Sequence, residues 1–303
     1  MDNETWFDGF ETVDMDMDVD GVTVHARVGG AAGAPPVLLL HGFPQTHAMW
    51  HRVACALAPQ FRLVLPDLRG YGDSGKPPGG ADHAGYSKRA MAGDLIGLMR
   101  TLGHEHFAVA GHDRGGRVAH RLALDHPQAV RRLCVLDIAP TLDMYAATDM
   151  AFARAYYHWF HLIQPAPLPE TMIGGCAREY LHAKLGGWGT GGLAHLEPRA
   201  LAEYERCFCR PEAIHAACED YRAAAGIDLE HDRASREQGQ RLACDLRVLW
   251  GARGVVQRQF DPLALWRAQC DGTVDGRALD CGHFLPEERP QETAEALAEF
   301  FAE

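Results

Sequence analysis

The chain has no long apolar run and no surplus of basic residues. None of its 303 residues lies in a stretch that approaches the roughly 20 apolar residues of a transmembrane helix. Lysine and arginine number 29 against 41 aspartates and glutamates, which gives a formal net charge of −12. Nucleic acids and anionic membranes repel a chain of this charge, so we expect neither as a main partner. A local pair of arginines can still bind a small anion.

Signals for export and for structural zinc are also missing. The first ten residues are acidic and lack the basic start and apolar core of a signal peptide. Nine cysteines are scattered along the chain; Cys207 and Cys209 form a C-x-C, but no second pair stands at zinc-site spacing. We therefore expect a cytoplasmic protein with reduced thiols and no metal site.

Buried strands alternate with amphipathic helices along most of the chain. Buried strands are predicted at 35–42, 61–70 and 107–112, the first of them as a continuous apolar run typical of a strand covered on both faces. Further strands are predicted at 130–140, 246–251 and 277–282. Alternation of polar and apolar residues at 12–29 predicts an antiparallel hairpin with its turn at Asp20 and Gly21. Helical patterns lie at 47–57, 87–102, 115–126 and 290–303. This order predicts an α/β fold with a mostly parallel sheet and helices on both faces.

The alternation stops between Thr141 and Arg241, where helical patterns and proline- or glycine-rich turns occur without a buried strand. We predict that residues 1–140 and 242–303 form an α/β core and that 141–241 is a helical cap inserted after the sixth strand. Open α/β sheets bind ligands at the carboxyl ends of their strands. The cap is therefore expected to lie over that edge.

The sequence GHDRGGR at 111–117 places an acid in a turn between a strand and a helix. Strand, glycine-flanked turn and helix make up the nucleophile elbow, usually G-x-S-x-G, and here the central residue is Asp113. Aspartate is ionised at neutral pH, so it can displace a leaving group from saturated carbon without a base. The resulting ester must then be hydrolysed, which needs a base and an oxyanion hole. The alternative for Asp113 is a helix N-cap.

Two further residues fit the hydrolysis of such an ester. His283 follows the last predicted strand, the position of the base in this kind of fold, although it is one of 17 histidines. Asp137 directly follows a predicted strand and is our candidate for the acid that orients His283, with Asp261 as the second choice. The alternative for Asp137 is a turn or cap residue.

Arginines flank the candidate nucleophile. Arg114 is the next residue and Arg117 lies one helical turn further on. Guanidinium groups bind carboxylates through two parallel hydrogen bonds, so the pair favours a substrate with its own carboxylate. The alternatives are a solvated helix face for Arg117 and a charge that merely keeps Asp113 ionised for Arg114. Gly42 allows a close turn, and we predict that the backbone N–H groups of Phe43 and Arg114 form the oxyanion hole.

The chain resembles the α/β-hydrolases with an aspartate nucleophile, which include epoxide hydrolases and dehalogenases. Essentially the whole chain is similar to fluoroacetate and haloacetate dehalogenases, through HGFPQTHAMWHR (41–52), DLRGYGDSGKP (67–77), GHDRGGRVAHRLALDHP (111–127), YHWF (157–160), CEDYRAA (218–224) and GHFLPEE (282–288). Relatives with neutral substrates usually have Trp after the nucleophile, where this chain has Arg114. Gly116 stands where Ala is common in the family, which we expect to be a minor change.

The resemblance implies hydrolytic dehalogenation of a short 2-haloacid, such as fluoroacetate or chloroacetate, to a 2-hydroxy acid and halide. It makes Asp113 the nucleophile, His283 the base and Asp137 the acid, and it assigns the substrate carboxylate to Arg114 and Arg117. The departing halide would be held by His158, Trp159 and Tyr221. Their N–H and O–H donors suit a poor leaving group such as fluoride. The resemblance implies no cofactor and a homodimer.

Other functions use part of the same machinery. An epoxide hydrolase would need acids to protonate the epoxide, usually two tyrosines, and Tyr221 with Tyr157 or Tyr180 could supply them; the adjacent arginines argue against it. A non-catalytic protein that binds a small acid is the alternative from another class, and the presence of both Asp113 and His283 argues against it. A serine esterase is the weakest alternative because no serine occupies the elbow.

Overall fold

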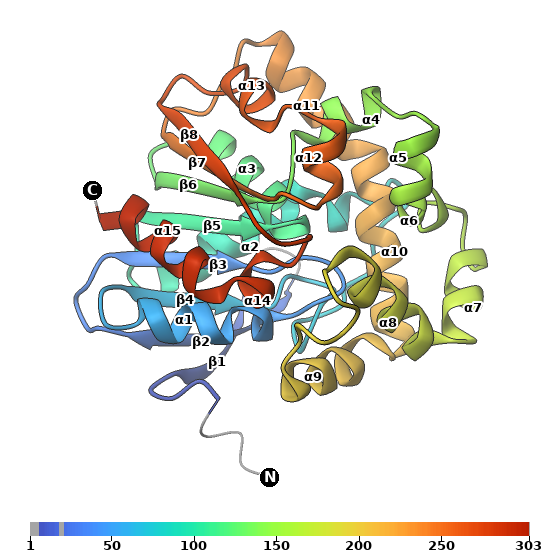
Figure 1. Cartoon of the computed structure of the whole chain (residues 1–303), viewed down its shortest axis with the longest axis horizontal. Coiled ribbons are helices and arrows are strands. Elements are labelled where there is room, and N and C mark those ends of the chain that lie inside the picture. The colour runs from blue at the N-terminus through green and yellow to red at the C-terminus, as the bar shows by residue number, and fades with distance from the viewer. Residues whose placement is uncertain (1–5, 18–20, 303) are drawn as a thin grey trace.

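An eight-stranded, mostly parallel sheet forms the centre of the computed structural model, which describes residues 6–17 and 21–302 (Figure 1). The strand order is β1-β2-β4-β3-β5-β6-β7-β8. β1 and β2 pair with each other and β2 with β4 in antiparallel fashion, and all later neighbours are parallel. The strands are β1 Glu11–Asp16, β2 Thr23–Gly30, β3 Pro36–Leu40, β4 Arg62–Pro66, β5 Phe107–His112, β6 Val130–Leu136, β7 Asp245–Gly251 and β8 Val274–Leu279.

Helices cover both faces of this sheet, as predicted. α1 packs against α15 on one face, and α2 packs against α3 on the other (Figure 1). The helices outside the segment between β6 and β7 are η2 His47–Trp50, α1 His51–Leu57, η3 Ala84–Tyr86, α2 Lys88–Thr101, α3 Arg114–Asp125, α12 Val255–Gln259, α13 Pro262–Arg267, α14 Leu285–Glu288 and α15 Pro290–Ala302.

The chain between β6 and β7 is entirely helical or looped, which confirms a helical insertion after the sixth strand. Figure 1 shows α5 to α10 gathered beyond one end of the sheet. The insertion contains α4 Thr141–Ala146, α5 Met150–Ala155, α6 Tyr157–His161, α7 Leu168–Gly174, α8 Ala177–Trp188, α9 Pro198–Phe208, α10 Pro211–Ala225 and α11 Ile227–Glu237.

Several predicted strands have different bounds in the structure, among them the one predicted at 61–70, which is Arg62–Pro66. The last strand is Val274–Leu279 rather than 277–282, because the chain pairs with β7 from Val274 onward. Gly276, which lies just before the predicted strand, is inside the observed one, and a Cβ there would meet Val248 O at 2.0 Å. The strand predicted at 130–140 ends at Leu136, because Asp137 has a φ of +52° and leaves the extended conformation. Asp20, in the predicted hairpin turn, lies outside the described residues.

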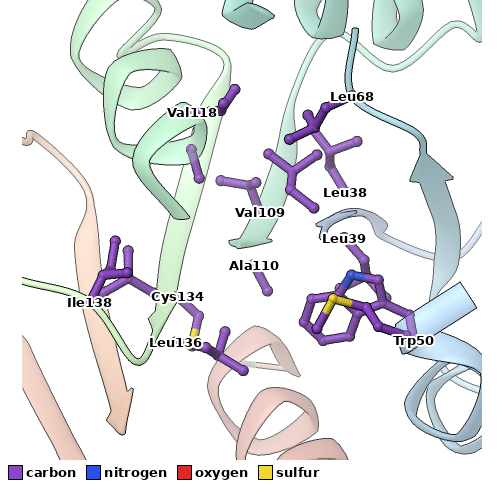
Figure 2. Packing of buried hydrophobic residues seen from close by; sticks show 14 of the residues in the cluster. Leu38, Leu39, Trp50, Leu68, Val109, Ala110, Val118, Cys134, Leu136 and Ile138 are labelled. Carbon is purple, nitrogen blue, oxygen red and sulfur yellow. The ribbon is translucent and has the colours of Figure 1, made fainter. Parts of the chain in front are cut away.

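The hydrophobic core lies between the central strands and their helices. Figure 2 shows part of this cluster, which includes Leu38 and Leu39 of β3, Val109 and Ala110 of β5, Leu136 of β6 and Trp50. All of these side chains are fully buried, which is why the three strands appear in the sequence as continuous apolar runs. All nine cysteines are free thiols. Within the described part of the chain, no helix has the length and apolarity needed to cross a membrane.

A buried acid joins the insertion to the core. Glu287 of α14 accepts a hydrogen bond from the Tyr204 hydroxyl of α9 at 2.8 Å and one from the Gln45 amide. Burial raises the pKa of Glu287 to about 8, although both hydrogen bonds favour the ionised form. The folded protein therefore keeps Glu287 protonated at pH values where the unfolded chain ionises it. That difference stabilises the fold at acidic pH and is lost as the pH rises from about 4.5 to about 8.

Replacing Glu287 by Gln is expected to remove this pH dependence, because the amide is neutral and has nearly the same shape. The unfolding free energy of the wild type should fall below that of Glu287→Gln by up to about 1.4 kcal/mol per pH unit above pH 4.5. Urea unfolding of both proteins at pH 5 and pH 8 measures the gap. A gap that is equal at the two pH values would contradict a protonated Glu287.

Candidate functional site

Asp113 stands at the tip of a tight turn between β5 and α3. Its φ of +47° and ψ of −114° are rare for a residue with a side chain, and they occur at nucleophile elbows. Close packing holds the turn: a Cβ on Gly115 would lie 2.3 Å from His41 O, and one on Gly42 would lie 2.6 Å from Asp113 Cβ. Small residues at both positions let the loop after β3 approach the carboxylate.

The Asp113 carboxylate points toward that loop. Its Oδ2 accepts a hydrogen bond from the Phe43 N–H at 3.0 Å, and its side chain makes no capping hydrogen bond to α3. The alternative role of Asp113 as a helix N-cap is therefore not supported, because the capping hydrogen bond is absent. Burial alone would raise the pKa of Asp113, but His283, His112 and the two neighbouring arginines hold it below the ordinary value. The carboxylate is thus ionised and nearly dehydrated, with an exposed fraction of 7%.

His283 and Asp137 form a buried pair beside Asp113. His283 Nδ1 lies 2.6 Å from Asp137 Oδ2, and Asp137 Oδ1 accepts from the Gly251 N–H at 3.0 Å. Burial lowers the pKa of His283, but the hydrogen bond and charge of Asp137 and the charge of Asp113 raise it above the ordinary value overall. The second-choice acid, Asp261, is instead exposed and caps α13 by accepting from Ala264 N at 3.0 Å.

Arg114 is anchored by an acid from the insertion. Its Nε and Nη2 donate to the two carboxylate oxygens of Asp220 at 2.9 and 2.6 Å, and its guanidinium lies 4.2 Å from the centre of the Tyr221 ring. Its Nη1 is buried and has no hydrogen-bond partner. Arg114 is the first residue of α3, so its backbone N–H has no acceptor within the helix. That N–H and Nη1 are free to bind other groups.

Arg117 is a buried cation that forms no ion pair within the described residues. Its Nη1 donates to Thr141 Oγ1 at 2.9 Å and Ala139 O at 3.3 Å, and its guanidinium lies 4.8 Å from the centre of the Trp159 ring. Its Nε is buried without a partner. Burial lowers the pKa of Arg117 despite the nearby charge of Asp113. Burying a cation without an ion-pair partner is costly, so an anionic ligand in contact with Arg117 would be favourable.

The three residues assigned to the halide by resemblance are also buried. His158 Nδ1 and the Tyr221 hydroxyl have no hydrogen-bond partner, and both rings contact Phe43, with centroid distances of 6.0 and 5.3 Å. Burial, with the nearby charge of Lys184, lowers the pKa of His158 well below its ordinary value, so its imidazole is neutral. Trp159 instead packs its ring against Arg117 and Tyr156.

Sequence reasoning missed three residues around this site. Asp220 lies next to Tyr221 in the stretch CEDYRAA, and its charge could have been matched to Arg114. Tyr156 precedes the stretch YHWF, and Asp137 and Asp113 contribute, after burial, to raising its pKa well above the ordinary value. Trp188 contacts His158, at a centroid distance of 4.5 Å, but lies in a glycine-rich stretch that indicated only a loop. Tyr157 and Tyr180, proposed as epoxide-protonating acids, flank Lys184 instead.

One group among the described residues has metal-ligating atoms close together: His25, His47 and Asp67 offer one atom each, within 4.8 Å of one another. The Asp67 carboxylate already accepts hydrogen bonds from the backbone N–H of His47 at 2.8 Å and of Asp73 at 2.9 Å, and it contacts the His47 ring. These contacts hold the loop after β4, and we assign the group that structural role.

Known proteins share this arrangement of fold and sequence. Residues 35–181 match the family model described as alpha/beta hydrolase fold. A fluoroacetate dehalogenase from Burkholderia sp is 45% identical, with 98% of this chain and 95% of that protein covered. A soluble epoxide hydrolase from Corynebacterium sp. (strain C12) is 30% identical over 94% and 95% of the two chains. The crystal structure of a putative α/β hydrolase from Nostoc sp PCC 7120 is 52% identical, with a TM-score of 0.93 over 97% and 98%.

Proposed function

The chain belongs to the α/β-hydrolase family and is a hydrolase that acts on carbon–halide bonds, and from this premise we propose that its substrate is a short 2-haloacid such as fluoroacetate or chloroacetate. The observation that carries the proposal is the pair of unpartnered guanidinium nitrogens beside Asp113. Arg114 Nη1 and Arg117 Nε are both buried without a hydrogen-bond partner. A substrate carboxylate would satisfy both and would neutralise the buried Arg117.

The first chemical step is a displacement by Asp113. With the carboxylate bound by the arginines, an Asp113 oxygen attacks the carbon that bears the halogen. The new C–O bond forms an ester while the carbon–halogen bond breaks and its electron pair leaves with the halide. The unpartnered His158 Nδ1 and Tyr221 hydroxyl are placed to donate to that halide, and Trp159 completes the group that the resemblance implies.

The second step is hydrolysis of the ester. His283 removes a proton from water, and Asp137 holds the imidazole by its Nδ1 and stabilises the imidazolium. The water oxygen attacks the carboxyl carbon of Asp113, and the backbone N–H groups of Phe43 and Arg114 stabilise the oxyanion. Cleavage of the acyl C–O bond restores the Asp113 carboxylate, and the imidazolium of His283 returns its proton to the departing alkoxide, which leaves as the 2-hydroxy acid. This sequence uses no cofactor.

The helical insertion has a role in this scheme, because it supplies His158, Trp159, Asp220 and Tyr221. We therefore propose residues 141–241 as a cap over a core of 1–140 and 242–303. The homodimer and the cytoplasmic location stay predictions. The large exposed apolar side chains of Met150, Tyr157, Leu168 and Met172 lie on α5 to α7, where a second copy would bury them.

Epoxide hydrolysis is the second candidate function, because one observation favours it. Tyr156 and Tyr221 are both buried beside Asp113, whose charge contributes to raising the pKa of each after burial. Two such hydroxyls could protonate an epoxide oxygen. The uncompensated Arg117 would then have no ligand, which is why we favour the haloacid.

Product analysis separates the two candidates. The purified protein is incubated separately with fluoroacetate, chloroacetate and styrene oxide, and fluoride, chloride and diol are quantified. We expect halide from at least one of the acids and no diol, because a neutral epoxide leaves both arginines unsatisfied. Diol without halide would contradict the dehalogenase proposal and support epoxide hydrolysis instead.

A further inference from the structure

A small cavity connects the candidate base with the protein surface. It has a volume of about 100 Å³, and His283 forms part of its lining. One side of the lining comes from the insertion, through Tyr156 and the segment 187–190 at the end of α8. The other side comes from Gly282 and from the segment after β7, through Arg253, Gly254, Val255 and Arg258. The cavity faces solvent where it is lined by the exposed residues Gly187, Arg253 and Arg258.

Hydrogen bonds fix the two sides of the cavity relative to each other. The His283 N–H donates to Trp188 O at 2.9 Å. The Glu288 carboxylate accepts from the backbone N–H groups of Thr190 at 2.9 Å and of Gly282 at 3.0 Å, which joins the insertion to the His283 loop. The opening is therefore already formed without a ligand.

One of the arginines around the opening has no carboxylate partner. Arg253 is paired with Asp280, with Nε to Oδ1 at 2.8 Å. The carboxylate of Glu288 is engaged by the Thr190 side chain as well as by backbone N–H groups of Thr190, Gly282 and Phe284. Arg258 donates to Arg253 O at 2.5 Å but has no carboxylate partner within the described residues. Arg258 thus places a cation without an ion-pair partner at the opening, on a chain whose net charge is −12.

Tyr156 lines this cavity and is electrostatically coupled to the reacting groups. It lines the cavity together with Arg258 and His283. After burial, the charges of Asp137 and Asp113 act to raise its pKa, and those of Arg117 and Arg258 act to lower it. Its hydroxyl is therefore within electrostatic reach of the nucleophile, of Arg117 and of the arginine at the opening.

We propose that this cavity is the entrance of the site and that Arg258 makes it selective for small carboxylates. A negatively charged protein repels an anionic substrate, whereas a positive charge at a narrow opening raises the local substrate concentration and the association rate. A carboxylate attracted by Arg258 would pass Tyr156 and then bind Arg117 in place of Arg258. The inference rests on the proposed function for the identity of the acid.

The test measures the exchange of fluoroacetate by ¹⁹F NMR in an Asp113→Asn background, where the acid binds without reacting. Adding Arg258→Gln should slow association about 3- to 10-fold at low ionic strength. The difference should vanish in 1 M salt, where the screening length is about 3 Å. The matched control is Arg131→Gln, which removes an equally exposed charge from the start of β6, at the opposite end of the sheet's strands, and should leave the rate unchanged.

A second variant tests the path itself. A Cβ on Gly187 would meet no atom within 4 Å, and Gly187 lines the cavity, so Gly187→Phe is expected to be tolerated on α8 and to narrow the opening. Association and dissociation should slow together while the dissociation constant stays the same, which is the behaviour of an obstructed passage.

The outcomes separate this inference from the proposed function. If neither Arg258→Gln nor Gly187→Phe changes the exchange rates, or if Arg131→Gln has the same effect as Arg258→Gln, the entrance lies elsewhere and the inference is wrong. If both variants act as expected but the wild type releases no halide from fluoroacetate, the entrance for carboxylates stands and the proposed reaction fails.

Discussion

Asp113→Asn is expected to reduce halide release by about 10⁴-fold or more, because the amide cannot act as the nucleophile. The side chain keeps its size and an oxygen for the Phe43 N–H, so the fold should not change. His283→Gln should give a different defect. Attack on the haloacid does not use His283, so each chain should release about one equivalent of halide and then stop.

Matched substitutions of the two candidate acids check that this burst reflects the His283 pair. Asp137→Asn removes the charge 2.6 Å from His283 Nδ1 and should slow turnover by about 10⁴-fold, as loss of the orienting acid does in related triads. Asp261→Asn removes the charge of an exposed helix cap and should leave turnover unchanged. Equal losses from the two variants, or no burst from His283→Gln, would contradict the assignment.

Arg117→Met is expected to abolish most binding of the acid without weakening the fold. Loss of a hydrogen-bonded charge facing the substrate carboxylate, at roughly 1.5–3 kcal/mol, should lower kcat/KM for haloacids by about 10- to 150-fold. The unfolding free energy should stay the same or rise, because the variant replaces a buried cation that has no ion-pair partner. Halide-release kinetics and urea unfolding measure the two effects.

The same substitution at Arg114 provides the contrast. Arg114→Met should also lower kcat/KM, but it would leave Asp220 with Lys88 and Tyr71 as its remaining partners. Breaking a buried pair in this way typically costs about 3–5 kcal/mol of stability. Arg117→Met should be the stable variant of the two. If Arg117→Met is instead the less stable variant, Arg117 stabilises the fold, and its assignment to substrate binding alone is wrong.

The core machinery could be predicted from the sequence because each of its parts lies at a strand end. The glycines around Asp113 define a turn by their spacing alone, and His283 follows a recognisable last strand. Asp137 could be ranked above Asp261 because it directly follows a buried strand. These are local signals, and the parallel sheet then brings the strand ends together.

The surroundings of the site could not be predicted because they depend on contacts distant in sequence. Asp220 meets Arg114 across 106 residues, and nothing local to either residue selects the other. That contact leaves Nη1 as the one side-chain nitrogen of Arg114 without a hydrogen-bond partner. No local sequence signal distinguishes the side chains of the two arginines in this way. The last strand was predicted to begin one residue after Gly276, and only the close approach of Gly276 to Val248 shows why glycine is needed inside the strand.

The measurement that tests the central claim most directly is the mass of the peptide containing Asp113 after His283→Gln has reacted with fluoroacetate. We expect this peptide to gain the mass of one carboxymethyl group, which fragmentation locates on Asp113. The amount of modified peptide should equal the amount of fluoride released. Fluoride release without a modified peptide would show that water attacks the substrate directly, and a modification on any other residue would remove Asp113 from its role.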